Sequence, residues 1–258
     1  MKLSFSFYTN VGKVRQNNED ALLVINKVYS EENFEDCKSE FVQGEEFIFV
    51  VADGMGGHSK GEVASRLTLE SLLENKKRVF ENPEEVLQLS KRKLDEYAMS
   101  NPSALGLGCA VAGIVLKGGI AKVFNAGDCR VYRFINSKLI RLTKDHSVVE
   151  KLLSLGVINE SEAKYHPQRH VLTSCIIGDP DSEINEIFIN EVEIYEDDVF
   201  LICSDGLWDE LNEEEIKTAL SEKEPCKAFL SLLSEKPLKD NLSFIIVKVE
   251  EVEDGGSS

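Results

Sequence analysis

The chain has 258 residues, of which 42% are hydrophobic and 29% are charged, and its formal net charge is −17. These values are typical of a folded globular protein and exclude a disordered, collagen-like or disulfide-scaffold chain. The negative charge disfavours nucleic acid and membrane as partners, because anionic polymers and lipids are bound through Lys and Arg.

The length allows one large core, and no linker interrupts the chain. We therefore predict one domain over residues 1–250, with 251–258 as a flexible tail. No apolar run approaches the ~18 residues that span a bilayer, and the amino terminus lacks the apolar core of a signal peptide. We expect a cytoplasmic monomer. In that compartment the six cysteines, at 37, 109, 129, 175, 203 and 226, are predicted to be mostly buried free thiols, and disulfides are disfavoured.

The amino-terminal half is predicted to begin with strands and continue with helices. The strands are expected at 4–8, 21–25 and 47–52, and the helices at 61–75 and 82–99. Asn82 can cap the second helix, and Pro83 suits its first position. The acidic segment from Tyr29 to Glu46 is interpreted as an insertion that forms a solvated loop or strand face, with a docking surface as the alternative.

The carboxyl-terminal half is predicted to contain two further groups of strands. Residues 106–143 alternate β-rich runs with glycine turns, which predicts a meander of three or four antiparallel strands. Two short helices follow, the second of them capped by Asn159, and later helices begin at Asn212 and near Pro225. The remaining strands are expected at 186–194, 198–204 and 242–249.

Two blocks of strands and two pairs of helices predict an α+β protein, in which helices cover an antiparallel sandwich.

Four of the apolar strand segments place an aspartate at one end, three of them beside glycine. Asp53-Gly54, Gly127-Asp128 and Asp205-Gly206 each follow such a segment, and Asp240-Asn241 precedes one. Strand geometry fixes the direction of each carboxylate, and a small neighbour leaves room beside it. Crowded carboxylates repel one another, so they persist when protonated, separated by solvent or neutralised by a cation. The pattern predicts a metal-binding acidic cluster.

Two further blocks complete the pattern. One joins Arg15 to Glu19 and Asp20, and the other is Asp53-Gly54-Met55-Gly56-Gly57-His58. Together with Gly127-Asp128-Cys129-Arg130, Ser204-Asp205-Gly206-Leu207-Trp208-Asp209 and Asp240-Asn241, these blocks resemble the metal-dependent serine/threonine protein phosphatases of type 2C, in their compact bacterial form. The resemblance covers residues 4–249. It implies a four-layer α/β/β/α sandwich with two antiparallel sheets flanked by helix pairs.

The resemblance also implies the ligands of two Mn²⁺ or Mg²⁺ ions. Asp53 would bridge the ions, the Gly54 carbonyl and Glu19 would serve one of them, and Asp205 with Asp240 would serve the other. Asp20 would act through water. Asp128, Asp205 and Asp209 would form a third, weaker metal position. Oxygen ligands select such hard cations. Arg15 would bind the substrate phosphate, since a guanidinium matches phosphate oxygens in pairs.

The implied reaction is hydrolysis of phosphoserine or phosphothreonine in proteins by direct attack of a metal-bridging hydroxide, without a phosphoenzyme. The partners would be phosphorylated proteins made by a serine/threonine kinase. Animal members have a histidine where this chain has Met55, and we do not assign the general acid to His58. The arginine usual in the block Ser174-Cys175-Ile176-Ile177-Gly178 is absent, which affects substrate handling by the flap at 145–178.

Three alternatives are left open. The first is a phosphatase-shaped binding module that has lost catalysis, although such modules usually lose a bridging ligand and this chain keeps its aspartates. The second is a phosphatase of small metabolites. The third concerns Asp209, which could instead cap a helix after Trp208. His146 and the other histidines lack zinc-like spacing, so hydrogen-bonding or surface roles are expected for them.

Overall fold

The computed structural model describes residues 1–55 and 60–252. Gly56, Gly57 and His58 of the glycine-rich block lie outside the described residues, as do residues 253–258 of the predicted tail.

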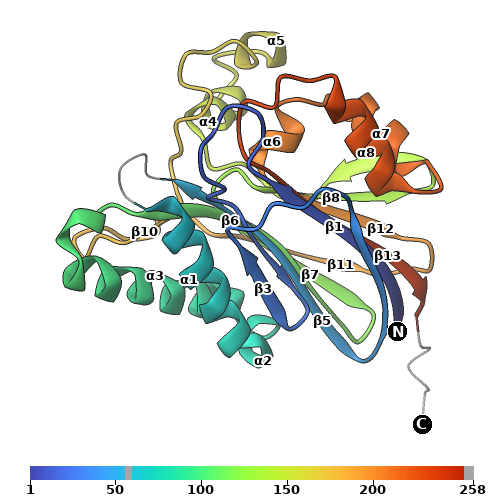
Figure 1. The fold of residues 1–258 in the computed structure, drawn as a ribbon, viewed down its shortest axis with the longest axis horizontal. Coiled ribbons are helices and arrows are strands. Elements are labelled where there is room, and N and C mark those ends of the chain that lie inside the picture. Colours follow the sequence, from blue (N-terminus) through green and yellow to red (C-terminus); the bar gives the residue numbers. More distant parts are fainter. Residues whose placement is uncertain (56–59, 253–258) are drawn as a thin grey trace.

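Two antiparallel sheets form the centre of the molecule (Figure 1). Among the described residues, the first sheet has the order β4-β1-β13-β12-β8-β9 and the second has the order β11-β7-β6-β5-β2-β3, with β10 pairing β6. The first sheet contains β1 Lys2–Asn10, β4 Lys38–Gln43, β8 Arg130–Ile135, β9 Lys138–Arg141, β12 Val199–Cys203 and β13 Leu242–Glu251. The second contains β2 Ala21–Val24, β3 Lys27–Ser30, β5 Glu46–Met55, β6 Gly108–Lys117, β7 Ile120–Ala126, β10 Ile176–Ile177 and β11 Phe188–Glu193.

Helices cover the outer face of each sheet (Figure 1). The long helices α1 Gly61–Glu74 and α3 Pro83–Ser100 pack on the second sheet, and α7 Glu213–Leu220 and α8 Pro225–Ser234 pack on the first. The short ones are α2 Lys76–Val79, the 3-10 turn Pro102–Ala104, α4 Val148–Ser154, α5 Glu160–Ala163 and α6 Asp205–Trp208. The predicted four-layer α+β sandwich is confirmed.

Aromatic contacts show how the layers are held together. Phe5 of β1 and Phe49 of β5 join the two sheets, with ring centroids 5.3 Å apart. Phe244 of β13 meets Phe229 of α8 on the outer face, also at 5.3 Å. Each of these side chains is buried, and burying one contributes roughly 1.5–3 kcal/mol. Because both faces of the central strands are covered, β12 is a continuous apolar run.

The asparagine caps predicted from the sequence are confirmed. The side chains of Asn159 and Asn212 each accept a hydrogen bond from the backbone three residues on, and the glutamate there bonds back to the asparagine N–H. Asn82 accepts from the Glu85 N–H at the start of α3. Each cap satisfies N–H groups that the helix leaves free.

The predicted meander at 106–143 is wrong in one respect. Its strands are present, but β6 and β7 lie in the second sheet whereas β8 and β9 lie in the first. The chain changes sheet at Gly127-Asp128, between β7 and β8. Turn residues identify the end of a strand but not its partner strand. The sequence therefore does not indicate that the chain passes from the second sheet to the first at this turn.

Residues 29–46, interpreted from the sequence as an insertion with a solvated loop or strand face, contribute a strand to the first sheet. Residues 38–43 form the strand β4, which pairs antiparallel with β1 at the sheet edge. Most of β4 is exposed, and charged side chains on an edge strand protect it from pairing with other chains. Phe34 is buried and packs edge-on against Phe7 and Tyr29. The segment is therefore part of the sandwich.

The expectation that disulfides are absent is wrong for one pair of cysteines. Cys37 and Cys226 form a disulfide with Cα atoms 6.2 Å apart, joining the start of β4 to helix α8. They are 189 residues apart in sequence, and only the packing of α8 on the sheet brings them together. The four remaining cysteines are free, and Cys109, Cys129 and Cys203 are buried as expected.

Candidate active site

The strand register gathers the predicted acidic residues at one end of both sheets. In the second sheet Ala21 pairs with Ala52, so Asp20 and Asp53 are neighbours. In the first sheet Cys203 pairs with Phe244, which puts the end of β12 beside the start of β13. Asp205 follows the one strand and Asp240 precedes the other. The pairing therefore brings these aspartates to the same end of the two sheets.

Their mutual electrostatic influence shows the same convergence. Burial raises the pKa of Asp53 well above its ordinary value, and the charges of Asp20, Asp205, Asp128 and Asp240 raise it further. Acids from both sheets thus act on one carboxyl group.

Three other aspartates of the cluster are similarly perturbed. Burial raises the pKa of Asp20 to about 7, although hydrogen bonds from serine hydroxyls act in the opposite direction. Burial also raises the pKa of Asp205 to about 7, and the negative charge of Asp240 is the second cause. The pKa of Asp128 is raised well above its usual range by burial and by the charge of Asp205. Groups of this kind mark functional sites because ionising them costs free energy unless a cation compensates.

The hydrogen bonds of the cluster leave two oxygens unused. The Ser204 hydroxyl donates to Asp20 Oδ2 at 2.8 Å. Asp20 Oδ1 and Asp205 Oδ1 are buried without a hydrogen-bond partner among the described residues. A buried acceptor without a donor is costly, and a cation would satisfy it.

The donor chemistry of the site therefore fits hard divalent cations. Within residues 1–55 and 60–252, no three side chains of Asp, Glu, His or Cys already form a group that could hold an ion. Ionised aspartates repel one another, so several of them can act as ligands together only when a cation neutralises their charge. Backbone carbonyls and water, which hard cations also accept, complete such sites.

Gly54 and Glu19 lie against each other beside Asp53. The Gly54 N–H donates to the Glu19 carbonyl at 3.2 Å, and a Cβ at Gly54 would lie 2.3 Å from the Gly61 carbonyl oxygen. Only glycine fits there. The Ser65 hydroxyl and the Asn241 side chain also bond the Glu19 backbone, at 2.6 and 2.8 Å. Burial, and then the neighbouring Glu62, raise the pKa of the Glu19 side chain.

Arg15 reaches the cluster from the loop between β1 and β2. Its Nη2 donates to Asp240 Oδ2 at 2.6 Å, and about half of its side chain is exposed. The hydrogen bond to Asp240 raises the pKa of Arg15, and the charges of Glu19 and Asp205 act in the same direction. The structure thus brings Arg15 to the predicted ligands and leaves it accessible.

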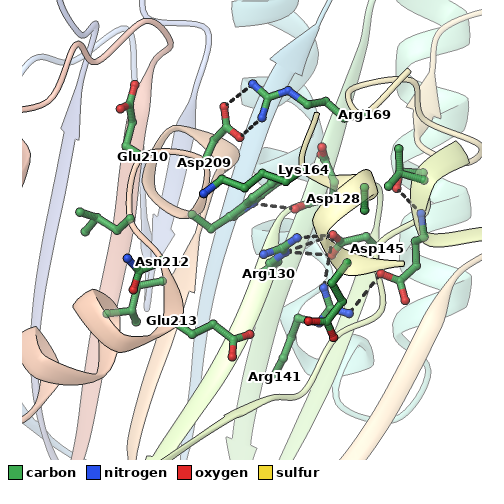
Figure 2. Close-up of a pocket in the computed structure, with 18 of the residues that line it drawn as sticks. Asp128, Arg130, Arg141, Asp145, Lys164, Arg169, Asp209, Glu210, Asn212 and Glu213 are labelled. Carbon is green, nitrogen blue, oxygen red and sulfur yellow. Dashed lines mark hydrogen bonds and ion pairs between the residues drawn. The ribbon is translucent and has the colours of Figure 1, made fainter. Parts of the chain in front are cut away.

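Asp209 is placed differently from the other predicted ligands. Its carboxylate accepts two hydrogen bonds from Arg169 of the flap, at 2.6 and 2.9 Å (Figure 2). It follows the last residue of α6, and the next helix, α7, is capped by Asn212. The alternative that Asp209 caps a helix after Trp208 is therefore wrong. A metal role for Asp209 would require the Arg169 pair to open.

Around Asp128 lie polar residues to which the sequence analysis gave no role. Arg130 binds Asp145 through Nε and Nη2 (Figure 2) and stacks 3.7 Å from the centre of the Trp208 ring. The Trp208 indole N–H donates to the Asp128 carbonyl at 3.1 Å. Trp208 thus contacts the site.

A cavity of about 620 Å³ opens beside this group, between the flap and α7. Its wall includes Asp128, Lys164, His170, Asp209 and Glu213, and Figure 2 shows side chains from both sides pointing into it. His170 Nδ1 lies 3.9 Å from Asp205 Oδ2, so the cavity is continuous with the acidic cluster. Its size and its polar wall suit a peptide segment.

Comparisons with known proteins agree with the site. A family model described as protein phosphatase 2C matches residues 32–245. The serine/threonine phosphatase Stp of Listeria welshimeri is 29% identical over 255 residues, which cover 94% of each chain. The crystal structure of the Mycobacterium tuberculosis serine/threonine phosphatase PstP/Ppp has a TM-score of 0.82 at 26% identity, over 97% of this chain and 100% of that one.

A further structure, the catalytic domain of the serine/threonine protein phosphatase PstP in complex with two manganese ions, shares the fold with a TM-score of 0.76 at 23% identity, over 97% of this chain and 100% of that chain. The resemblance stated from the sequence motifs is confirmed, because the family model spans most of the chain and both sheets of the sandwich. This chain belongs to the protein phosphatase 2C family, whose members are metal-dependent serine/threonine phosphatases.

Proposed function

We propose that this chain hydrolyses phosphoserine and phosphothreonine in proteins at the cluster formed by Asp20, Asp53, Asp205 and Asp240. The observation that carries the proposal is the convergence of these carboxylates from two sheets, with burial raising the pKa of three of them. Clusters of buried carboxyl groups with raised pKa values are typical of functional sites, because they cost folding free energy. The alternative of an inactive binding module is not favoured, because no acid of the cluster has been lost.

The cluster would hold two divalent cations, Mn²⁺ or Mg²⁺. Asp53 would bridge them, Glu19 and the Gly54 carbonyl would bind one, Asp205 and Asp240 would bind the other, and Asp20 would act through water. The unpaired oxygens of Asp20 and Asp205 support this assignment, and the related PstP catalytic domain was solved with two manganese ions. When bound, the cations would activate water and neutralise charge on the phosphate. A third, weaker position would involve Asp128, Asp205 and Asp209.

The residues of this chain would bind and orient the substrate around that centre. Arg15 would leave Asp240 and take two phosphate oxygens, which fixes the phosphorus atom over the cluster. The cavity of about 620 Å³ between the flap and α7 would take the peptide on one side of the phosphorylated residue. Asn241 would keep the Arg15 loop in place, since its amide donates to the carbonyls of Val11 and Asn17 at 3.0 and 2.9 Å.

Replacement of Arg15 by alanine is expected to raise KM for a phosphothreonine peptide about tenfold and to lower kcat less than threefold. The reason is that a half-exposed guanidinium bonded to the rim of the cluster is placed to bind the phosphate in the ground state. Steady-state kinetics on peptides of varied concentration measure the split. Arg15→Lys keeps the charge but not the paired donors, so its KM should lie between those of the unmodified chain and Arg15→Ala. A loss confined to kcat would instead assign Arg15 to the transition state.

The proposed function is tested by metal-dependent hydrolysis. Purified protein should release phosphate from a phosphothreonine peptide, and p-nitrophenol from p-nitrophenyl phosphate, when Mn²⁺ or Mg²⁺ is present. Chelation should remove both activities, and added Mn²⁺ should restore them. Activity that is unchanged in the chelator would refute the metal-dependent mechanism. Hydrolysis of sugar phosphates in preference to phosphopeptides would favour a metabolite phosphatase instead.

The remaining assignments are proposals with narrower support. We infer that residues 1–250 form one catalytic domain, because β1 near the start pairs with β13 near the end. Phosphorylated proteins are the proposed partners, and the net charge of −17 disfavours nucleic acid and membrane. No helix of the described residues is long and apolar enough to cross a bilayer. A cytoplasmic monomer is proposed. The four free cysteines support that location, whereas the Cys37–Cys226 disulfide does not.

A further inference from the structure

His146 is a buried histidine with no role in the mechanism above. Its side chain is 1% exposed, and it lies at the start of the flap, next to Asp145. Two hydrogen bonds join it to the turn that carries Asp128. The Gly127 N–H donates to His146 Nδ1 at 3.1 Å, and the His146 N–H donates to the Gly127 carbonyl at 2.9 Å. Because Nδ1 accepts a proton donor, the proton of the neutral ring is on Nε2.

The turn that His146 contacts requires glycine at position 127. Gly127 has φ +113°, and a Cβ there would lie 2.4 Å from the Cβ of Ala110 on β6. Its carbonyl also accepts from Asn125 Nδ2 at 3.1 Å, and the same amide donates to the Lys144 carbonyl at 2.8 Å. The Gly127 N–H has its bond only through the imidazole in the part of the chain that the structure describes. Without this acceptor a buried donor would be unsatisfied.

His146 also joins the two stems of the flap. Its carbonyl accepts from the Thr173 N–H at 2.8 Å, and the next residue, Ser147, forms a β-bridge with Leu172. The outgoing stem, the returning stem and the Asp128 turn therefore meet at one residue. Asp145, the preceding residue, is bound to Arg130 on the far side of the same turn. Any movement at this junction would move the Asp128 carboxylate.

We propose that His146 is a positioning residue for the phosphatase reaction, which orients the Asp128 carboxylate through the Gly127 N–H and couples it to the flap. This inference rests on the proposed function, because it concerns the weaker metal position to which Asp128 is assigned. The imidazole does not contact the substrate. Its contribution is to fix a backbone turn, and that turn directs the carboxylate.

The proposed positioning role does not involve the second ring nitrogen, Nε2. His146 Nε2 has no hydrogen-bond partner among the described residues, and it lies 3.9 Å from Glu186 Oε1. The proposed role uses Nδ1 alone. Asparagine places its side-chain oxygen where the imidazole has Nδ1, whereas leucine has nearly the same shape as asparagine but no acceptor. His146→Asn and His146→Leu are therefore a matched pair that differ in this one hydrogen bond.

The experiment compares these two variants with Asp128→Ala in the full chain. His146→Leu is expected to lower kcat for a phosphothreonine peptide about tenfold with little change in KM. It should also weaken the lowest-affinity Mn²⁺ site seen by calorimetry to the same extent as Asp128→Ala. His146→Asn should keep kcat and Mn²⁺ binding within about threefold of the unmodified chain. The double variant His146→Leu/Asp128→Ala should be no worse than Asp128→Ala, since residues that act as a unit are not additive.

The failures of the two proposals can be told apart. If Asp128→Ala reduces turnover but His146→Leu and His146→Asn behave alike, or if the double variant shows the sum of both losses, the positioning role is wrong. If Asp128→Ala changes neither turnover nor Mn²⁺ binding, both the weaker metal position and the role of His146 fall, while the reaction at Asp53 stands. Circular dichroism checks folding. Should His146→Leu not fold, His146→Gln replaces it, because its amide lies one atom too far out to accept from Gly127.

Discussion

Asp53→Asn is expected to lower kcat by at least about a thousandfold while the protein stays folded. Asp53 is the carboxylate on which the acids of both sheets act, so an amide there removes the group proposed to bridge the two cations. The loss corresponds to several kcal/mol of transition-state stabilisation. Phosphate release from a phosphothreonine peptide in saturating Mn²⁺ measures kcat. Asp205→Asn should act in the same way, because the charge of Asp205 is among those that raise the pKa of Asp53.

The matched control is Asp181→Asn, which makes the same chemical change at an exposed aspartate on the surface. It should leave kcat within twofold. Calorimetric titration should show that Asp53→Asn loses tight Mn²⁺ binding while the control does not. The melting temperature of metal-free Asp53→Asn should be no lower than that of the unmodified chain, because the substitution removes a buried carboxyl group whose ionisation is costly. Substantial activity in Asp53→Asn would place the catalytic centre elsewhere.

The metal-free protein is expected to become less stable as pH rises from 5.5 to 8. The pKa values of Asp20 and Asp205 are raised to about 7 in the folded state, whereas in the unfolded chain they are near 4. Between these values the folded state binds more protons than the unfolded state, so the free energy of unfolding falls with pH until the folded pKa is passed. The change is on the order of several kcal/mol. Denaturant titrations at each pH measure it.

Asp20→Asn removes the contribution of Asp20 to the pH dependence of stability and leaves that of Asp205. The amide oxygen can still accept from the Ser204 hydroxyl, as Asp20 Oδ2 does, but the side chain no longer ionises. The variant should be more stable than the unmodified chain at pH 8 and should show a shallower dependence on pH. Added Mn²⁺ should stabilise the unmodified chain more at pH 8 than at pH 5.5, since the cations bind the ionised carboxylates. Equal pH dependence in both proteins would show that Asp20 is solvated rather than buried.

Local features of the fold could be predicted from the sequence because their causes are local. Asn159 and Asn212 cap helices through atoms within three residues of themselves. The apolar runs before Asp53 and Asp205 are strands because both of their faces are buried. The partners of strands are different, since they depend on contacts between distant parts of the chain. For this reason the sheet change at Gly127 and the pairing of β4 with β1 were missed.

The candidate site also has features that the local sequence predicts and features that depend on distant contacts. Asp53, Asp128, Asp205 and Asp240 could be proposed because each lies at the end of an apolar run, and the register then brings them together. The sequence contained no indication that Asp209 would be bound to Arg169 from the flap, 40 residues away. Nor did it show that Trp208 would donate to the Asp128 carbonyl. Such contacts follow from how the flap and α6 pack, which no local pattern encodes.

The bond between Cys37 and Cys226 closes a covalent ring that contains the flap and both of the aspartates Asp53 and Asp205. A protease that cuts the chain once inside this ring leaves two polypeptides that remain linked through sulfur. The amino-terminal and carboxyl-terminal arms outside the ring pair with each other as β1 and β13. The fragments of a nicked molecule would therefore separate only after reduction.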